Sequence, residues 1–300
     1  MIPWKRIVIV MLCNLCIGAL SYFVSRDVQV IYSNPLYNEQ LKDVIYENIK
    51  LHNEKFTISF RGNTEQIDQQ LERIMHDLQY EDPYVYENIM EWNANYSYTS
   101  QQATVNLFIT YLITREEEQF VDQEVKKLAR QLTHDNMSDF EKVKEIHDYV
   151  VRHTEYSSET NSSQYSPYTI LTEQKGVCQA YAFLIYRLLQ EVNIEALYVK
   201  GQVGENLHGW NLVKLGNEWY HVDATWNERI SEGQSDVGYQ YFLVTDQQMM
   251  LTHSWIQSVY PSAVAKNGVV SEYLETSRTI GEKYNVEQRL STQQFMTMPL

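Results

Sequence analysis

The feature that most constrains this fold is the apolar run at residues 180–189, which begins two positions after Cys178. The run is long enough for a buried helix. Three candidate strands follow it, at residues 196–202, 209–215 and 218–223. The Gly216-Asn217 pair between the last two strands is typical of a tight hairpin turn. The sequence therefore predicts an α+β domain in which a helix packs on an antiparallel sheet.

Charge limits the kind of partner that this chain can bind. The 300 residues carry a formal net charge of -15, and 44% of them are hydrophobic, which is ordinary for a globular protein with a sizeable core. Residues 1–26 contain basic but no acidic side chains, so the remainder is more acidic still. Nucleic acids and anionic lipids attract positive surfaces, so the acidic composition disfavours both as direct partners.

The N-terminus resembles a targeting segment. Lys5 and Arg6 precede an uncharged, mostly apolar stretch at residues 7–24. As a helix this stretch would be roughly 27 Å long, close to the ~30 Å hydrocarbon core of a bilayer. The sequence Ala19-Leu20-Ser21 would also suit signal-peptide cleavage. We therefore expect residues 1–26 to be a transmembrane anchor or a signal peptide, with the rest of the chain outside the cell membrane or secreted.

Cysteine usage singles out one thiol. Cys13 and Cys16 lie within the apolar N-terminal segment, where their C-x-x-C spacing lacks the context of a redox or metal motif. Cys178 alone remains outside it, so no disulfide is expected within the exported body. Its thiol is either a buried core group or a reactive one.

Two modules are expected after a polar linker at residues 26–35. The first, residues 27–137, is a small α+β module with predicted helices at 38–49, 64–78 and 115–132 and predicted strands at 55–60, 92–98 and 104–110. The second, residues 138–262, begins with a helix whose Ser138 and Glu141 form a capping-box pattern. The polar segment 263–300 is expected to be a C-terminal tail.

The order of Cys178, His208 and Asp223 indicates nucleophilic catalysis. A thiol near the first turn of a helix is favoured as thiolate, and it needs a neighbouring base. The predicted hairpin would bring His208 and Asp223 side by side, so the carboxylate could orient the imidazole. His221 is a rival base. Residues two positions apart on a strand point to the same face, so His221 would lie on the same face as Asp223.

Three sequence blocks carry a resemblance to a known family. The blocks are GVCQAYA at residues 176–182, HGWN at residues 208–211 and DATW at residues 223–226. They resemble the signature blocks of bacterial transglutaminase-like domains, in the same order, over roughly residues 138–261. The resemblance implies a papain-like transglutaminase core with a nucleophile at Cys178, a base at His208 and an orienting acid at Asp223.

The remaining site predictions concern the surroundings of the thiol. Trp210 and Trp226 are expected to form walls of the cleft, and Tyr168 or Gln174 is a candidate donor to the oxyanion of a tetrahedral intermediate. A metal bound by His208, His221 and Asp223 is not favoured, because no second ligand cluster accompanies them. No cofactor is expected.

The function expected from this set is cysteine-dependent acyl transfer on peptide amides. With water as acceptor the protein would be a protease or amidase, and with an amine it would be a crosslinking transglutaminase. Water is always present at high concentration, which favours hydrolysis. The expected partner is a peptide or protein substrate, including cell-wall-associated ones. The alternative is a non-catalytic binding or scaffold module that keeps the same fold at the cell surface.

Overall fold

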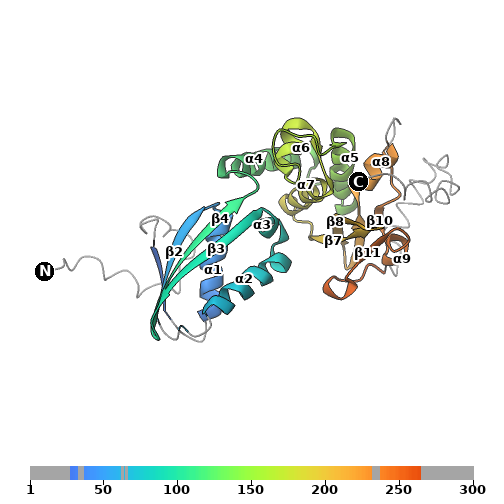
Figure 1. The fold of residues 1–300 in the computed structure, drawn as a ribbon. Coiled ribbons are helices and arrows are strands. Elements are labelled where there is room, and N and C mark those ends of the chain that lie inside the picture. Colours follow the sequence, from blue (N-terminus) through green and yellow to red (C-terminus); the bar gives the residue numbers. More distant parts are fainter. Residues whose placement is uncertain (1–27, 33–36, 62–63, 65–66, 232–236, 265–300) are drawn as a thin grey trace. The chain divides into compact units, whose positions relative to one another are not determined.

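The chain divides into two compact units. The computed structural model describes residues 28–32, 37–61, 64, 67–231 and 237–264 (Figure 1). Unit 1 comprises Met1–Leu78 and Glu91–Thr110, and unit 2 comprises Gln79–Met90 and Tyr111–Leu300. This division differs from the one drawn at residue 138, because residues 79–90 and 111–137 belong to unit 2.

The expected N-terminal segment at residues 1–26 lies outside the described residues, as does most of the expected tail at residues 263–300. Within the described ranges, no helix combines the length and the apolar character needed to cross a membrane. The anchor or signal peptide therefore stays a prediction from sequence.

Unit 1 contains a four-stranded sheet in the order β1-β2-β4-β3. The elements that build it are β1 (Val28–Tyr32), α1 (Tyr37–Lys50), β2 (Lys55–Arg61), α2 (Ile67–Glu81), β3 (Ile89–Tyr98) and β4 (Gln102–Tyr111). β1 pairs in parallel with β2. The prediction of a polar linker at residues 26–35 is therefore wrong for residues 28–32, which form this strand. Its VQVIY sequence is rich in β-branched residues, which favour a strand.

Alternation along β2 and β4 determines which face of this sheet is buried. Phe56, Ile58 and Phe60 of β2 are buried, and the residues between them are only partly covered. Val105 and Leu107 of β4 follow the same rule. Helices α1 and α2 lie along the sheet (Figure 1) and bury one apolar face each. The period-2 pattern in the sequence therefore corresponds to a one-sided core.

Unit 2 combines helices with a five-stranded sheet in the order β10-β9-β8-β7-β11. Its helices are α3 (Pro83–Glu87), α4 (Arg115–Leu132), α5 (Asp139–His153), α6 (Pro167–Glu173), α7 (Cys178–Glu191), α8 (Ala224–Ser231), α9 (Asp246–Met249) and the short 3-10 helix Gln257–Val259. Its strands are β5 (Glu155–Tyr156), β6 (Lys175–Gly176), β7 (Ala196–Val203), β8 (Asn206–Leu215), β9 (Glu218–Val222), β10 (Phe242–Val244) and β11 (His253–Trp255). The predicted α+β class is confirmed.

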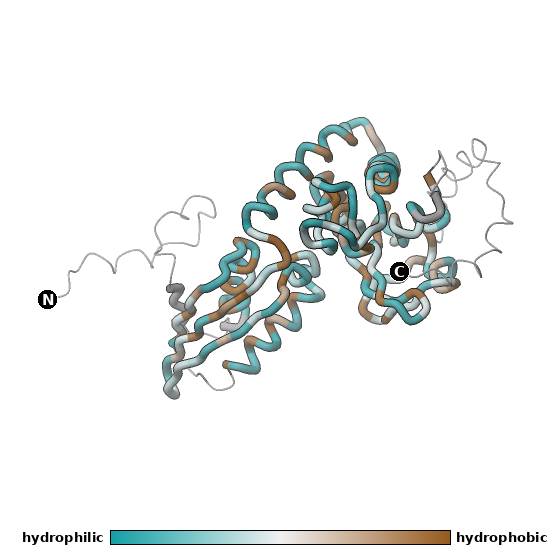
Figure 2. Tube along the Cα trace, turned by 45° about the horizontal axis from the view of Figure 1, so that its top comes forward, coloured by the Kyte–Doolittle hydropathy of each residue, from teal (hydrophilic) through white to brown (hydrophobic). Residues whose placement is uncertain are grey.

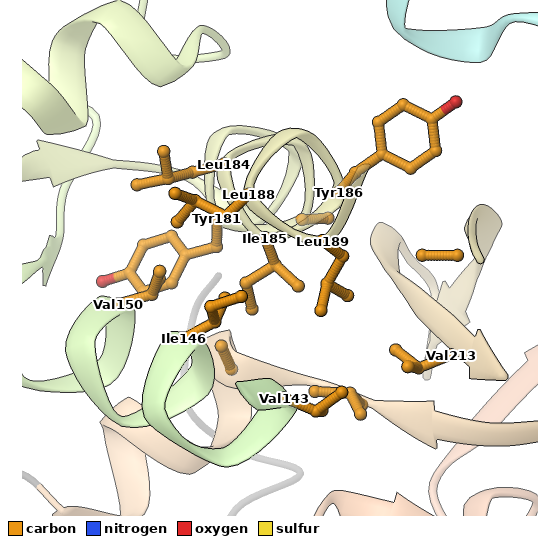
Figure 3. Close-up of a cluster of buried hydrophobic side chains, with 14 of the residues drawn as sticks. Val143, Ile146, Val150, Tyr181, Leu184, Ile185, Tyr186, Leu188, Leu189 and Val213 are labelled. Atoms are coloured by element: carbon orange, nitrogen blue, oxygen red, sulfur yellow. The ribbon is translucent and has the colours of Figure 1, made fainter. Parts of the chain in front are cut away.

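Helix α7 forms the centre of the unit 2 core. Figure 3 shows its side chains Ile185 and Leu189 directed toward α5 and β8, where they meet Ile146 and Val213. These residues are buried almost completely. A helix that is apolar on nearly every side must be covered on every side. The apolar run in the sequence thus specifies a helix enclosed between other helices and the sheet.

Two helices begin with the capping boxes that their sequences indicate. Ser138 accepts a hydrogen bond from the Glu141 backbone N–H, and the Glu141 carboxylate accepts one from the Ser138 backbone N–H. Thr114 and Glu117 form the same pair at the start of α4. Hydrophobic positions recur among hydrophilic ones along α4 (Figure 2). Val121 is one of the buried residues of this helix. Capping-box hydrogen bonds satisfy backbone donors that the first turn leaves unpaired.

The three predicted strands of unit 2 form an antiparallel meander. β7 pairs with β8, and β8 pairs with β9 across the turn at Gly216, whose φ is +60°. Glycine suits this left-handed backbone conformation, since it has no Cβ. β11 extends the sheet on the other side by pairing with β7. The sheet therefore gathers residues from distant parts of the chain.

Truncation of a core side chain in α7 should destabilise unit 2 strongly. Leu184 is fully buried, and we expect Leu184→Ala to lower the free energy of unfolding by about 2–5 kcal/mol, through lost burial and a residual cavity. The exposed Leu251 provides a control, since Leu251→Ala should change it by less than about 0.5 kcal/mol. Urea denaturation followed by circular dichroism measures both, and similar losses in the two variants would contradict this view of α7.

Candidate active site

Cys178 is the first residue of α7. Val177 precedes it as the N-cap, and no side chain there caps the helix. The cysteine is free and partly exposed. Backbone N–H groups in a first helical turn lack intrahelical partners, and the helix dipole favours negative charge beside them. The position therefore suits a thiolate.

The chain before Cys178 is packed closely against its neighbours. A Cβ added at Gly176 would lie 3.0 Å from the Ala180 Cβ and 3.1 Å from a side-chain carbon of Ile170. The neighbouring Val177 N–H donates to the carbonyl of Gln164 at 3.0 Å. Glycine at position 176 therefore allows the loop to approach α7 closely and fixes where the helix begins.

His208 and Asp223 lie side by side, as the predicted hairpin requires. His208 is on β8 and Asp223 follows β9, and both are buried. The His208 Nε2–H donates to Asp223 Oδ2 at 2.6 Å. The other ring nitrogen, Nδ1, is buried and makes no close hydrogen bond to any residue that the structure describes. One nitrogen therefore binds the carboxylate and the other is available.

The electrostatics of the pair favour imidazolium. Burial alone would lower the pKa of His208, but the charge and hydrogen bond of Asp223, together with Cys178, raise it to about 10. Burial would raise the pKa of Asp223, but His208 and then His253 hold it well below its usual range. Because Cys178 contributes to the pKa of His208, the thiol lies near this ring.

The carboxylate of Asp223 also caps a helix. Its Oδ1 accepts a hydrogen bond from the Trp226 backbone N–H at 3.0 Å, in the first turn of α8. Aspartate is a preferred residue at this position, because it satisfies a donor that the helix leaves unpaired. The local fold therefore fixes one carboxylate oxygen and leaves the other for histidine.

A second histidine, which the sequence analysis missed, contacts the same carboxylate. His253 begins β11, is buried, and its Nε2 lies 3.0 Å from Asp223 Oδ2. Its neighbourhood, Thr252-His253-Ser254-Trp255, carries no recognised spacing. Only the pairing of β11 with β7 brings it to the site. No local pattern in the sequence could have identified it.

His221 engages other partners. Its Nδ1 accepts a hydrogen bond from Trp210 Nε1 at 2.9 Å, and its Nε2 contacts Asp246 Oδ1 at 2.9 Å. Burial lowers its pKa despite the opposing effect of Asp246. Both ring nitrogens are therefore engaged, and neither hydrogen-bonds to Asp223.

The two predicted tryptophans lie against the imidazoles. Trp210 is buried and stacks on His208 with ring centroids 5.8 Å apart and planes at 22°. Trp226 is buried as well and meets His253 edge-on at 5.6 Å. Both indoles therefore support the histidine rings from within the protein.

The predicted oxyanion donors lie on or next to α6. Tyr168 is partly buried, and its ring packs edge-on against Phe120 of α4. Gln174 ends α6 with a φ of +58°, and its side chain is exposed. Its backbone carbonyl accepts a hydrogen bond from the Glu155 N–H at 2.8 Å. These contacts do not direct either side chain to Cys178.

Tyr198 is a second residue that the sequence analysis missed. A Cβ added at Gly209 would lie 2.3 Å from its hydroxyl oxygen, so the phenol lies over the backbone next to His208. Burial, and then the charge of Cys178, raise the pKa of Tyr198 well above its usual value. The phenol therefore stays protonated close to the thiol. One tyrosine among 23 gives no signal in the sequence.

Asn211 connects the strand of His208 to the helix of Cys178. Its side-chain Nδ2 donates to the Ala182 carbonyl of α7 at 3.0 Å. Both residues are buried, where a hydrogen bond is costly to lose. The asparagine of the HGWN block therefore holds β8 against the first half of α7.

His208, Asp223 and His253 offer three potential metal-ligand atoms within 4.8 Å of one another. Tetrahedral zinc with bonds of about 2.0–2.1 Å separates its ligand atoms by about 3.3 Å. The observed contacts of 2.6 and 3.0 Å are shorter, and each holds a proton. The atoms would have to move apart and both imidazoles would have to lose their Nε2 protons, so the cluster fits hydrogen bonding better than a metal.

Comparison with known proteins agrees with the motif blocks. Residues 126–224 match the family model described as the transglutaminase-like superfamily. The matched range includes all three residues singled out from the sequence, namely Cys178, His208 and Asp223.

Two curated relatives match part of the chain. The kyphoscoliosis peptidase of Mus musculus is 30% identical over an alignment of 118 residues, and the match covers 34% of this chain and 18% of the mouse protein. The protein of the same name from Homo sapiens is 29% identical over an alignment of 116 residues, and that match covers 33% of this chain and 18% of the human protein. The match spans under a fifth of the length of these relatives.

Two solved structures show a distant likeness to this chain. A candidate cysteine protease from Cytophaga hutchinsonii is 21% identical with a TM-score of 0.32, covering 46% of this chain and 65% of that one. A TGase is 18% identical with a TM-score of 0.33, covering 67% and 60% of the two chains.

The sequence match is confined to the part of unit 2 that contains α7, β7, β8 and β9, together with α5 and α6. This is the helix-on-sheet arrangement that the motif blocks implied. The chain therefore carries a domain of the transglutaminase-like superfamily at residues 126–224.

Proposed function

We propose that unit 2 is a cysteine-dependent acyl-transfer enzyme that acts on peptide amides. In this proposal Cys178 is the nucleophile, His208 the proton carrier and Asp223 the acid that orients the imidazole. The observation that carries it is the 2.6 Å hydrogen bond between His208 Nε2 and Asp223 Oδ2, with Cys178 near enough to the same imidazole to raise its pKa. A Cys-His-Asp site needs an imidazole between the acid and the thiol.

The resting state would be a thiolate and imidazolium pair. Asp223 is ionised and buried beside His208, so a proton on the imidazole is stabilised. The proton leaves the Cys178 thiol and binds His208 Nδ1. A helix N-terminus next to the sulfur further favours the negative charge. The nucleophile is then charged before a substrate arrives.

The reaction divides into two transfers. The Cys178 sulfur attacks the amide carbonyl carbon, and the carbonyl oxygen becomes an oxyanion. His208 gives its Nδ1 proton to the leaving amine as the C–N bond breaks, which leaves a thioester and a neutral imidazole. The imidazole then takes a proton from the acceptor, which attacks the thioester. The C–S bond breaks, and the thiolate and imidazolium pair is restored.

Backbone N–H groups in the first turn of α7 are the proposed donors to the oxyanion, because they lie beside the attacking sulfur. Tyr168 and Gln174 stay weaker candidates as second donors. His221 is a weak candidate base, since Trp210 and Asp246 engage its two nitrogens.

Water is the acceptor that we favour. An amine acceptor needs a binding site of its own, whereas water is always available. The matched curated relatives are named peptidases, which agrees with hydrolysis in this chain. We propose peptide or protein substrates outside the cell membrane, including wall-associated ones. That location depends on residues 1–26 acting as an anchor or signal peptide.

The thiolate can be tested without knowing the substrate. We expect Cys178 in the full-length chain to react with iodoacetamide at pH 6 at least about tenfold faster than an ordinary cysteine, because a charged His208 beside it favours the thiolate. A free cysteine titrates near ~8.5. His208→Ala should lower the rate at pH 6 at least about tenfold, and Asp223→Asn should lower it by a smaller factor. Stopped-flow alkylation and peptide mapping give the site and the rate.

An ordinary thiol that neither substitution affects would contradict the catalytic proposal. It would favour the alternative, a transglutaminase-like module that binds without catalysis.

The choice of acceptor needs a separate experiment. We expect a peptide library incubated with the full-length chain to yield new carboxyl termini or deamidated side chains labelled with one oxygen-18 from labelled water. Cys178→Ala should abolish the label, because no thioester can form. Mass spectrometry with added primary amine measures both outcomes. Amine incorporation that exceeds oxygen-18 incorporation would contradict hydrolysis as the main reaction and identify a transamidase.

A further inference from the structure

His253 is a buried, titratable side chain to which the mechanism above gives no role. It lies 45 positions after His208 in the sequence, yet its ring centroid is 5.4 Å from that of His208. Its Nε2 is 3.0 Å from Asp223 Oδ2, the same oxygen that His208 contacts. Two imidazoles therefore share one carboxylate oxygen.

The hydrogen bonds around His253 specify its tautomer. Ionised Asp223 can only accept, so His253 Nε2 carries the proton that lies between them. The opposite nitrogen, Nδ1, is 2.7 Å from the Thr252 hydroxyl. In a neutral ring this nitrogen is an acceptor, and the hydroxyl can donate to it. The protons thus point in one direction, from Thr252 through His253 to Asp223.

The surroundings keep His253 neutral while His208 is charged. Burial lowers the pKa of His253, and the nearby positive charge of His208 lowers it further, although Asp223 opposes both. The charge of His253 also acts on a third imidazole, His221, whose own partner is Asp246. Its remaining ring neighbours are aromatic, namely Trp210, Trp226 and Tyr241.

We infer that His253 is a positioning residue, which acts through Asp223 by sharing its Oδ2 and weakening its pull on the His208 proton. The inference rests on the proposed function and extends it. A carboxylate oxygen that accepts a second hydrogen bond offers less negative charge to the first donor. His208 can then release its proton to a leaving amine, and recover one from the acceptor, nearer to neutral pH.

Three separate elements therefore supply the donors that fix Asp223. His208 comes from β8, His253 from β11, and the Trp226 N–H from α8. With His253 removed, Oδ2 would serve His208 alone, and the ion pair would strengthen. The consequence would be an imidazole that is too basic rather than one that is misplaced, because the contact of Oδ1 with α8 would remain.

The test measures how fast the acyl-enzyme is hydrolysed at each pH. In the acyl-enzyme the sulfur carries no charge. p-Nitrophenyl acetate is an activated ester that acylates a reactive thiolate with a burst of nitrophenolate, after which His208 must act as base on water. The deacylation rate of the full-length chain should therefore rise with pH to a plateau, with a midpoint at the pKa of His208 in the acyl-enzyme.

We expect His253→Phe to move this midpoint upward by about one pH unit, which is a tenfold loss of rate well below the midpoint. The plateau should stay within about twofold of wild type. His253→Gln keeps an N–H donor but cannot titrate, so its midpoint should stay within a few tenths of a unit. His253→Met lacks the donor and differs in shape from phenylalanine, so it should repeat the shift even where phenylalanine fails to fold.

Other outcomes would overturn the inference. A lower plateau and a lower melting temperature in all three variants, with the midpoint unchanged, would mean that His253 only supports the fold. A shift in the glutamine variant as large as in the phenylalanine variant would mean that the donor is unimportant. A wild-type chain without a burst, or with one that survives Cys178→Ala, would overturn the proposed function itself and this inference with it.

Discussion

The buried carboxylate of Asp223 is the interaction on which the rest of the site depends. An ionised carboxylate inside a protein is costly unless donors satisfy it. Here His208, His253 and the Trp226 N–H donate to it, at 2.6, 3.0 and 3.0 Å. Each donor comes from a different element, so the charge can be buried only when β8, β11 and α8 are all in place. Burial of this charge and the arrangement of β8, β11 and α8 therefore depend on each other.

A second set of contacts sets the position of the thiol relative to this carboxylate. The Asn211 side chain ties β8 to the first half of α7, and Gly176 lets the preceding loop approach that helix. The sulfur is then placed by α7, while the imidazole is placed by β8. Their separation depends on backbone packing and not on the flexible ends of two side chains. This kind of preorganisation is what a nucleophile and base require.

The parts that could be predicted are those with short-range physical signals. The apolar run specified α7, Ser138 and Glu141 specified the start of α5, and Gly216 specified the turn between β8 and β9. The His208 and Asp223 pairing followed from that turn. His253 could not be predicted, because its contact depends on β11 pairing with β7 across about fifty residues. Tyr198 was missed for the same reason, as its phenol reaches the site through packing over Gly209.

Polar contacts also support Asp223 through helix α8. Asn227 of α8 contacts His147 Nε2 on α5 at 2.9 Å and accepts a hydrogen bond from the Tyr241 N–H at 2.9 Å. His147 in turn contacts Asp148, whose other oxygen accepts from Lys144. Since Asp223 caps α8, whatever fixes α8 also fixes the carboxylate. A helix that the sequence identified only by its hydrophobic face and its cap therefore helps to fix the Asp223 carboxylate through buried hydrogen bonds.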